Sequence, residues 1–208
     1  MLVEKGWFIT TLQFGPDDVF FVEDWDETPV GPYCALVHFT PDDHRTLYVS
    51  SEAGKELIST IHRCDEKVVT EIDSLRSGGC WTIGLNTGDK GELRIEVDYK
   101  ETALLKLANP IVSYTPEVIT RSPLYCRIVP RLAAPVLGTD PDQKMMGLTE
   151  MGRETRFRFH KIFMVPSARC SWGGKDIGPM TDCCYAHDMG DHKPTSKPVV
   201  VNLSLIVD

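Results

Sequence analysis

The side chains best suited to chemistry are concentrated near the C-terminal end of the sequence. The stretch Asp182-Cys-Cys-Tyr-Ala-His-Asp-Met-Gly-Asp-His192 places three Asp, two Cys and two His residues in eleven positions. Carboxylates and imidazoles at this spacing could hold a divalent metal ion, or could pair a general base with the acid that orients it. One hypothesis is therefore a metal-assisted hydrolase whose metal ligands are His187, Asp188 and His192. The alternative is a surface loop, rich in turn-forming residues, that joins two strands.

Part of this stretch resembles a known family. Asp182-Cys-Cys-Tyr-Ala-His-Asp188 resembles the active-site helix of secreted phospholipases A2, and Trp172-Gly-Gly-Lys-Asp-Ile-Gly178 resembles their calcium loop. The resemblance implies that His187 activates a water molecule and that Asp188 holds calcium. It covers under a tenth of the chain, and Met189-Gly190 stands where that family has a cysteine. We therefore expect neither the phospholipase fold nor its activity.

A second group of polar residues lies on expected strands. If these strands enclose a ligand cavity, the inward-pointing polar side chains would do the chemistry, and we expect them to be His38, Glu96, Tyr99 and His160. A lone histidine on an apolar strand, such as His38, is more often a core residue with a satisfied hydrogen bond. His160 shares a face with two arginines, which fits either an anion site or a solvated face beside an acidic strand.

Composition excludes several functional classes. The chain has 208 residues and a formal net charge of -8, which argues against nucleic acid as a partner, because phosphate binding needs clustered Lys and Arg. The sequence contains no dinucleotide fingerprint, P-loop, G-x-S-x-G or H-E-x-x-H motif. We expect no cofactor. The seven cysteines are odd in number and form no C-x-x-C pair, so we expect reduced thiols rather than disulfides or a structural zinc site.

Segments that target proteins to membranes are not evident. The sequence shows no signal peptide and no window of 18 apolar residues, so we expect a cytoplasmic protein without a membrane partner. The expected partner is a small apolar molecule, and self-association into a homo-oligomer is compatible with the acidic surface and edge strands.

Most segments with a clear pattern predict strands. Short runs of β-branched, aromatic and apolar residues, bounded by Gly, Pro or Asp, lie at 7–14, 19–22, 34–39, 46–49, 81–85, 92–99, 124–129, 155–165 and 199–207. Turn residues at 86–91 predict that residues 80–99 form a hairpin. The segment 155–165 alternates, which places Phe157, Phe159, Lys161 and Phe163 on one face.

Helical signals are fewer. Residues 51–62 predict a helix with Ser51 as N-cap, because Ala53, Leu57, Ile58 and Ile61 fall on one helical face. Residues 66–76 fit either a helix or a strand. Residues 102–108 are equally undecided, and Asn109-Pro110 is expected to end them.

These patterns together predict one mainly β domain over residues 1–208, built as an antiparallel barrel or sandwich with one or two short helices. A calycin-like or lipocalin-like barrel is favoured, and 1–130 and 150–208 could be two halves of the same fold. The leading functional hypothesis is a barrel that binds a small apolar molecule, with cofactor-independent isomerase or cyclase (lyase-type) chemistry on an apolar intermediate. The alternatives are the metal-assisted hydrolase centred on residues 170–192 and a structural or protein-interaction β-sandwich.

Overall fold

The computed structural model describes residues 1–137, 141, 143–183, 189–192 and 195–208. Its helices are α1 (Glu52–Ser59), α2 (Ala103–Tyr114), α3 (Glu117–Thr120) and α4 (Pro123–Leu137). Its strands are β1 (Leu2–Phe14), β2 (Asp18–Glu27), β3 (Tyr33–Phe39), β4 (Arg45–Val49), β5 (Glu66–Val69), β6 (Ile72–Ser77), β7 (Cys80–Asn86), β8 (Glu92–Lys100), β9 (Met146–Leu148), β10 (Glu154–Trp172), β11 (Lys175–Thr181) and β12 (Val199–Val207). In the described part of the chain, no helix is long and apolar enough to cross a bilayer.

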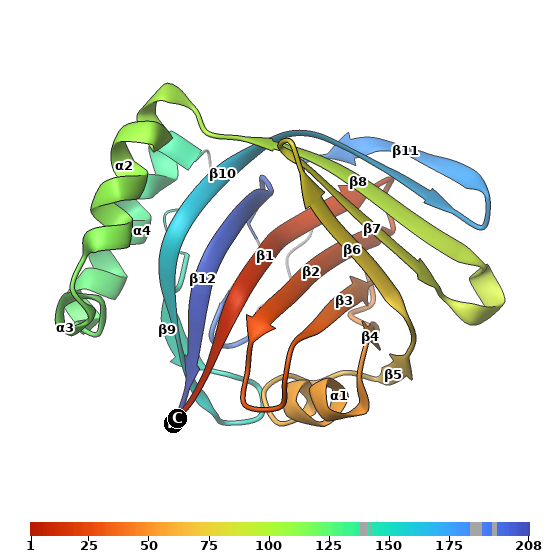
Figure 1. Cartoon of the computed structure of the whole chain (residues 1–208), viewed down its shortest axis with the longest axis horizontal. Helices are drawn as coiled ribbons and strands as arrows, with labels where there is room; N and C mark the ends of the chain where they lie inside the picture. Colours follow the sequence, from red (N-terminus) through yellow and green to blue (C-terminus); the bar gives the residue numbers. More distant parts are fainter. Residues whose placement is uncertain (138–140, 142, 184–188, 193–194) are drawn as a thin grey trace.

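All twelve strands belong to one strongly curved sheet (Figure 1). Its order is β5-β4-β3-β2-β1-β11-β10-β8-β7-β6, and β9 and β12 lie off this path. Every neighbouring pair is antiparallel except β4 and β5. The mainly β class is therefore confirmed, whereas the calycin-like barrel stays a prediction. The two expected halves share this sheet, because β10 pairs with β8 and β12 pairs with β1.

β1 and β10 each change their pairing partner along their length, which splits the sheet between these two strands. The first half of β1 pairs with β12, from Leu2 to Ile9, but its end pairs with β11 through Gln13 and Phe14. β10 divides in the same way between β12 and β11. The connection from β11 to β12, which carries Asp191 and His192, therefore leaves and re-enters the sheet at the split.

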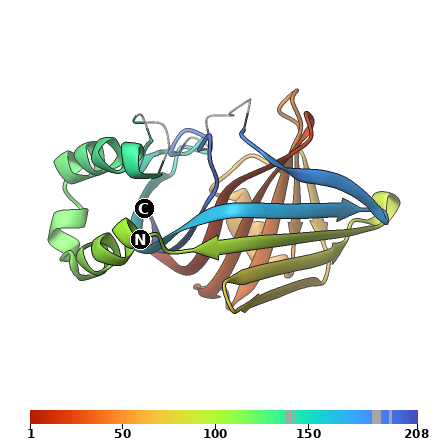
Figure 2. The same ribbon diagram turned by 90° about the horizontal axis from the view of Figure 1, so that it is seen from above.

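Two apolar cores lie on opposite faces of the central strands, because successive side chains of a strand point to opposite faces. One core, which we call the α1 core, contains Phe8, Phe21, Ile61, Phe157 and Leu203 among its members. The other, the hairpin core, joins Leu12, Phe20 and Val200 to the β7–β8 hairpin through Trp81 and Ile95. Figure 2 shows α2, α3 and α4 projecting together from one end of the sheet.

Several local predictions are confirmed. Residues 80–99 form the β7–β8 hairpin, and residues 199–207 form β12. α1 begins as predicted, with the Ser51 hydroxyl accepting a hydrogen bond of 3.0 Å from the Gly54 amide. The undecided segment 66–76 forms two strands, and 102–108 is helical.

Three local predictions are wrong. Residues 124–129 lie in α4 rather than in a strand. α2 continues through Pro110 to Tyr114, with Asn109 buried and bonded to the backbone of Ile162 in β10. Thirdly, the register of β10 against β12 shifts between Phe159 and Lys161. A β-bulge at this point reverses the faces, so Phe157 and Phe159 contact the α1 core while Phe163 contacts the hairpin core.

Candidate functional site

A buried centre forms where the β11–β12 connection folds over the α1 core. It consists of His62, Asp191 and His192, each of which can offer an atom that lies within 4.8 Å of the others. His192 Nδ1 lies 2.9 Å from Asp191 Oδ1, and His62 Nε2 lies 4.0 Å from Asp191 Oδ2. Thr155 donates a hydrogen bond of 2.6 Å to the same Oδ2 atom. One carboxylate therefore joins two imidazoles from distant parts of the sequence.

α1 positions His62. The His62 amide donates to the Ile58 carbonyl at 2.8 Å, so the residue continues the last turn of the helix. Gly54 lets the helix approach the sheet, because a Cβ atom at this position would lie 2.8 Å from the Tyr33 ring. The apolar face of α1 directs Ile58 and Ile61 into the α1 core, which carries His62 inward with them.

β9 and β10 position Asp191. Gly147 of β9 pairs with Thr155 of β10, and both contact the connection. A Cβ atom on Gly147 would lie 2.9 Å from Asp191 Cα, so the close packing needs a glycine. Gly190 has a φ of 88°, a conformation that glycine adopts without strain. The backbone on both sides therefore fixes the Asp191 carboxylate beneath Thr155.

Aromatic rings surround the His192 imidazole. The ring centroids of Phe157, Phe21 and Phe8 lie 5.4, 5.9 and 6.2 Å from that of His192. The His62 ring lies 5.5 Å away in an edge-on arrangement. This apolar surrounding strengthens electrostatic interactions, because little water is present to screen them.

The electrostatics favour a carboxylate beside a neutral imidazole. Burial raises the pKa of Asp191, but the hydrogen bond and charge of His192, the charge of His62 and the Thr155 hydrogen bond together lower it to about 2. Burial lowers the pKa of His62 to about 4, despite the nearby Asp191 carboxylate. At neutral pH the expected state is therefore an ionised Asp191 and an uncharged His62.

Two more carboxyl groups face the same interior. Glu23 lies opposite Phe8 in the β1–β2 pair and accepts a hydrogen bond of 2.9 Å from Trp25 Nε1. Burial raises the pKa of Glu23. Glu4 accepts a hydrogen bond of 2.5 Å from the Tyr33 hydroxyl, and burial raises its pKa to about 7. The interior is thus rich in carboxyl groups that resist ionisation.

Two imidazole nitrogens of the centre have no hydrogen-bond partner among the described residues. They are His62 Nδ1 and His192 Nε2, and both are buried. Buried polar atoms almost always have a partner, because an unpaired one keeps the full cost of losing its water. A bound ligand or ion would supply the partner that each nitrogen lacks.

His192 also forms part of the wall of a hollow beneath α4. The hollow has two small parts, of about 50 and 100 Å³, and both are partly open to solvent. The parts adjoin, because both are lined by Thr10, Gln143, Lys144, Phe159, Thr195 and Val201. His192, Phe8 and Phe157 line the smaller part, whereas Pro130, Ala133 and other residues of α4 line the larger one. The walls are mainly apolar.

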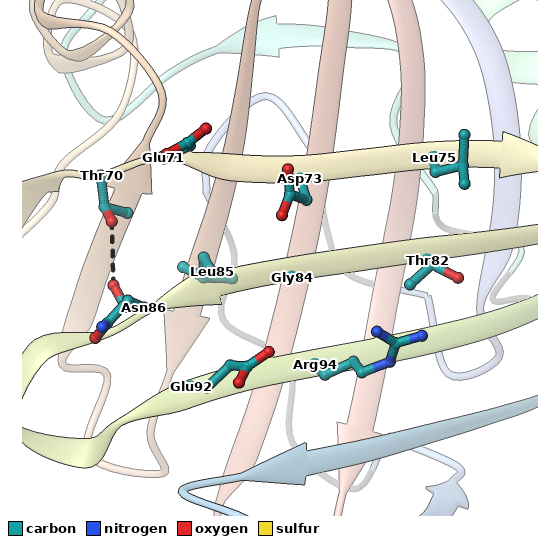
Figure 3. A pocket seen from close by; sticks show the side chains of 10 residues that line it. All are labelled: Thr70, Glu71, Asp73, Leu75, Thr82, Gly84, Leu85, Asn86, Glu92 and Arg94. Carbon is teal, nitrogen blue, oxygen red and sulfur yellow. Dashed lines mark hydrogen bonds between the residues drawn. The ribbon is translucent and has the colours of Figure 1, made fainter.

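A wider hollow lies on the outer face of β6, β7 and β8 (Figure 3). Its charged side chains, including Asp73, Glu92 and Arg94, are exposed. The one dashed bond in the figure joins the Thr70 hydroxyl to the Asn86 carbonyl at 3.1 Å. An exposed polar sheet face is ordinary for a half-solvated sheet, so its volume alone does not indicate a site.

The four strand residues expected to be catalytic have separate surroundings. His38 is buried against Phe20 and Trp172 and lies 2.8 Å from Asp18. Glu96 is half exposed and accepts from Arg94, Tyr99 packs on Phe163, and His160 lies 2.8 Å from the Ser204 hydroxyl. The structure brings none of these four into the centre around Asp191.

Of the three expected metal ligands, His192 lies in the centre, while His187 and Asp188 lie outside the described residues. Sequence reasoning missed His62 as a partner of His192. The one signal for it was its place at the end of an amphipathic helix, where the apolar face directs the next residue inward.

The sequence matches no known protein family, and no curated protein is significantly similar to it. Three solved structures are similar in shape over nearly the whole chain. Acetoacetate decarboxylase from Legionella pneumophila subsp. pneumophila str. Philadelphia 1 has a TM-score of 0.44 and 8% identity, covering 99% of this chain and 84% of the other. A second acetoacetate decarboxylase has a TM-score of 0.46 and 11% identity, covering 100% and 86%. The enduracididine biosynthesis enzyme MppR, complexed with pyruvate, has a TM-score of 0.40 and 9% identity, covering 100% and 88%. Similarity at this level assigns no role to any residue of the present chain.

Proposed function

We propose that this protein is an enzyme that binds a small apolar molecule in the hollow beneath α4 and acts on it at the His192 imidazole. One observation carries the proposal: His192, whose Nε2 atom has no hydrogen-bond partner among the described residues, forms part of the wall of an apolar hollow. Ligand sites typically combine apolar walls with a few fixed polar groups. Here Asp191 fixes the polar group.

The lining favours an apolar ligand with a polar end. Val129, Ala133, Leu137, Ile162 and Val201 contribute aliphatic surface to the larger part of the hollow. Polar side chains enter from Thr10, Gln143, Lys144 and Thr195. A ligand that buries its apolar body against α4 would direct its other end toward His192.

The sequence also led to a finer hypothesis, an isomerase or cyclase that acts on an apolar intermediate. Such an enzyme needs a group at the cavity wall that polarises or protonates the ligand. The Asp191–His192 pair supplies such a group, because a carboxylate that accepts from one ring nitrogen orients the other nitrogen. The chemistry belongs to this pair rather than to His38, Glu96, Tyr99 or His160.

The proposal is tested by filling the hollow. The apolar fluorophore N-phenyl-1-naphthylamine is titrated into the wild-type protein and into two variants of α4, Ala133→Trp and Leu132→Trp. Ala133 lines the hollow, whereas the adjacent Leu132 is 71% exposed, which makes it a matched control. We expect one binding site per chain, at least about tenfold weaker binding by Ala133→Trp, and unchanged binding by Leu132→Trp.

Circular dichroism and urea unfolding establish that both variants fold. Folded Ala133→Trp protein that binds the fluorophore as the wild type does would contradict the proposal. Equal loss of binding in the two variants would also contradict it, because the fluorophore would then be bound on the outer surface of the helices.

A further inference from the structure

We infer that His62, Asp191 and His192 bind a divalent transition-metal ion, through one nitrogen of each imidazole and an oxygen of the carboxylate. The inference rests on the proposed function and deepens it, because His192 would then present a metal ion to the ligand. The ion would polarise the polar end of the ligand as a Lewis acid. Two imidazoles and one carboxylate are a typical ligand set for zinc and for non-haem iron(II).

The spacing of the ligand atoms suits such an ion. Three atoms within 4.8 Å of one another need only small side-chain rotations to reach the about 3.3 Å that separates tetrahedral zinc ligands. The backbone is already fixed, because α1 holds His62 and the β9–β10 pair holds the connection. The site is therefore close to its metal-bound geometry.

The charge of the Asp191 carboxylate also favours a cation. Among the described residues its hydrogen-bond partners are Thr155 and His192, and neither is a lysine or arginine. The buried Arg45 is already bound to Asp43 and Glu150. Buried carboxylates are normally paired with a cation or coordinate a metal. A divalent ion at Asp191 would supply the missing positive charge.

The surroundings of the ligands match those of known metal sites. The imidazole nitrogens that lie near the Asp191 carboxylate are His192 Nδ1, at 2.9 Å, and His62 Nε2, at 4.0 Å, so these two would bind the ion. Thr155 donates to Asp191, as residues behind a ligating carboxylate commonly do. Phe8, Phe21 and Phe157 form an apolar wall beside His192, which limits the access of water.

The test is metal binding by the EDTA-treated full chain. Zinc binding is measured by isothermal titration calorimetry, and cobalt(II) binding by its visible absorption. We expect one ion per wild-type chain, and at least about hundredfold weaker binding by His62→Ala and His192→Ala. The matched control is His44→Ala, because His44 is an exposed histidine near Glu66 on the surface, and it should bind as the wild type does.

A fourth variant keeps the test decisive if the histidine variants unfold. Thr155→Val retains all three ligands but removes the hydrogen bond to Asp191, and we expect about tenfold weaker binding. The inference is overturned if the folded wild-type chain binds no ion stoichiometrically, or if His62→Ala keeps wild-type affinity. Cobalt absorption typical of thiolate ligands would also overturn it, because the ion would then be held by cysteines.

Failure of this inference and failure of the proposed function give different results. One outcome is that the metal-free protein binds N-phenyl-1-naphthylamine in a way that Ala133→Trp weakens, while no metal ion binds. That result would support the ligand site and contradict only the metal site. The Asp191–His192 pair would then act by proton transfer alone.

Discussion

Asp191 is the residue on which the buried centre depends, because its carboxylate is the contact shared by two histidines and a threonine. It is fully buried. A carboxylate in such a place is stable only while its hydrogen bonds are kept, since burial by itself opposes ionisation. The hydrogen-bond donors around Asp191 should therefore contribute measurably to folding.

Removing the Thr155 hydroxyl tests this contribution. Thr155→Val keeps the shape of the side chain but leaves Asp191 Oδ2 without its 2.6 Å donor, and we expect the free energy of unfolding in urea to fall by about 2 kcal/mol. Thr82→Val, on the half-exposed face of β7, is the control and should change it by less than about 0.5 kcal/mol. Equal effects of the two substitutions would show that the hydrogen bond from Thr155 to Asp191 adds nothing to the free energy of unfolding.

Glu4 should make stability depend on pH. Its folded pKa is raised from 4.5 to about 7, so its stabilising contribution is complete below about pH 4.5 and is lost as the pH rises through 7. We expect Glu4→Gln, which retains an acceptor for Tyr33, to gain stability relative to the wild type between pH 5 and pH 8. The gain is on the order of 2 kcal/mol and is measured by urea unfolding at both values. Parallel pH profiles of the two proteins would contradict it.

Among the elements, β9 is the shortest strand and yet supports the centre. Gly147 leaves no room for a Cβ atom beside Asp191, whereas a Cβ atom on Gly84 in β7 would meet only ordinary contacts. We expect Gly147→Ala to lower the free energy of unfolding by about 1–3 kcal/mol and to weaken cobalt binding, because the connection must shift. Gly84→Ala should do neither. Undiminished cobalt affinity in Gly147→Ala would show that Asp191 does not need this packing.

The elements also show what a single sequence can predict. The β7–β8 hairpin and α1 were predictable, because strict alternation, turn residues and the Ser51 cap are local signals. The bulge in β10 was not, because it depends on the register with β12, which no local pattern encodes. Residues 124–129 look like a strand by composition, but they lie in α4, whose inner residues cover the hollow.

The candidate site was predictable only in part for the same reason. His192 stood out because it lies in a dense polar cluster. Its partner His62 comes from the end of α1, and only the tertiary packing of α1 against the sheet brings the two together. The strand histidines His38 and His160 looked equally suitable in sequence, but each has its own partner elsewhere.

Across the molecule as a whole, the centre lies where β10 begins and β12 ends. Asp191 contacts Thr155 of β10, which pairs with Val207 of β12, whereas β10 exchanges β12 for β11 at the other end of this pair, beyond Met164 and Val199. The α1 core lies beneath the connection, and α4 covers the adjoining hollow. A site at such a junction draws residues from many elements, so binding there should stabilise the entire fold.

This stabilisation is a prediction for the intact chain. Zinc at about one hundred times its dissociation constant should raise the free energy of unfolding by about 2.7 kcal/mol, because the ion binds the folded state. His192→Ala should show no such increase at the same concentration. An equal increase in both proteins, measured by urea unfolding, would place the ion outside the centre.

Whether the hollow and the buried centre form one site is decided by following the histidine side chains while the hollow is being filled. Wild-type protein labelled with ¹⁵N-histidine, free of metal, is titrated with N-phenyl-1-naphthylamine, and the ring nitrogen signals are recorded by nuclear magnetic resonance. We predict that the signals of His192 and His62 shift in proportion to occupancy, because His192 lines the hollow and contacts His62, while exposed His44 stays unchanged. Saturable binding that leaves the His192 signals unmoved would contradict the proposed function, since the ligand site and the buried centre would then be separate.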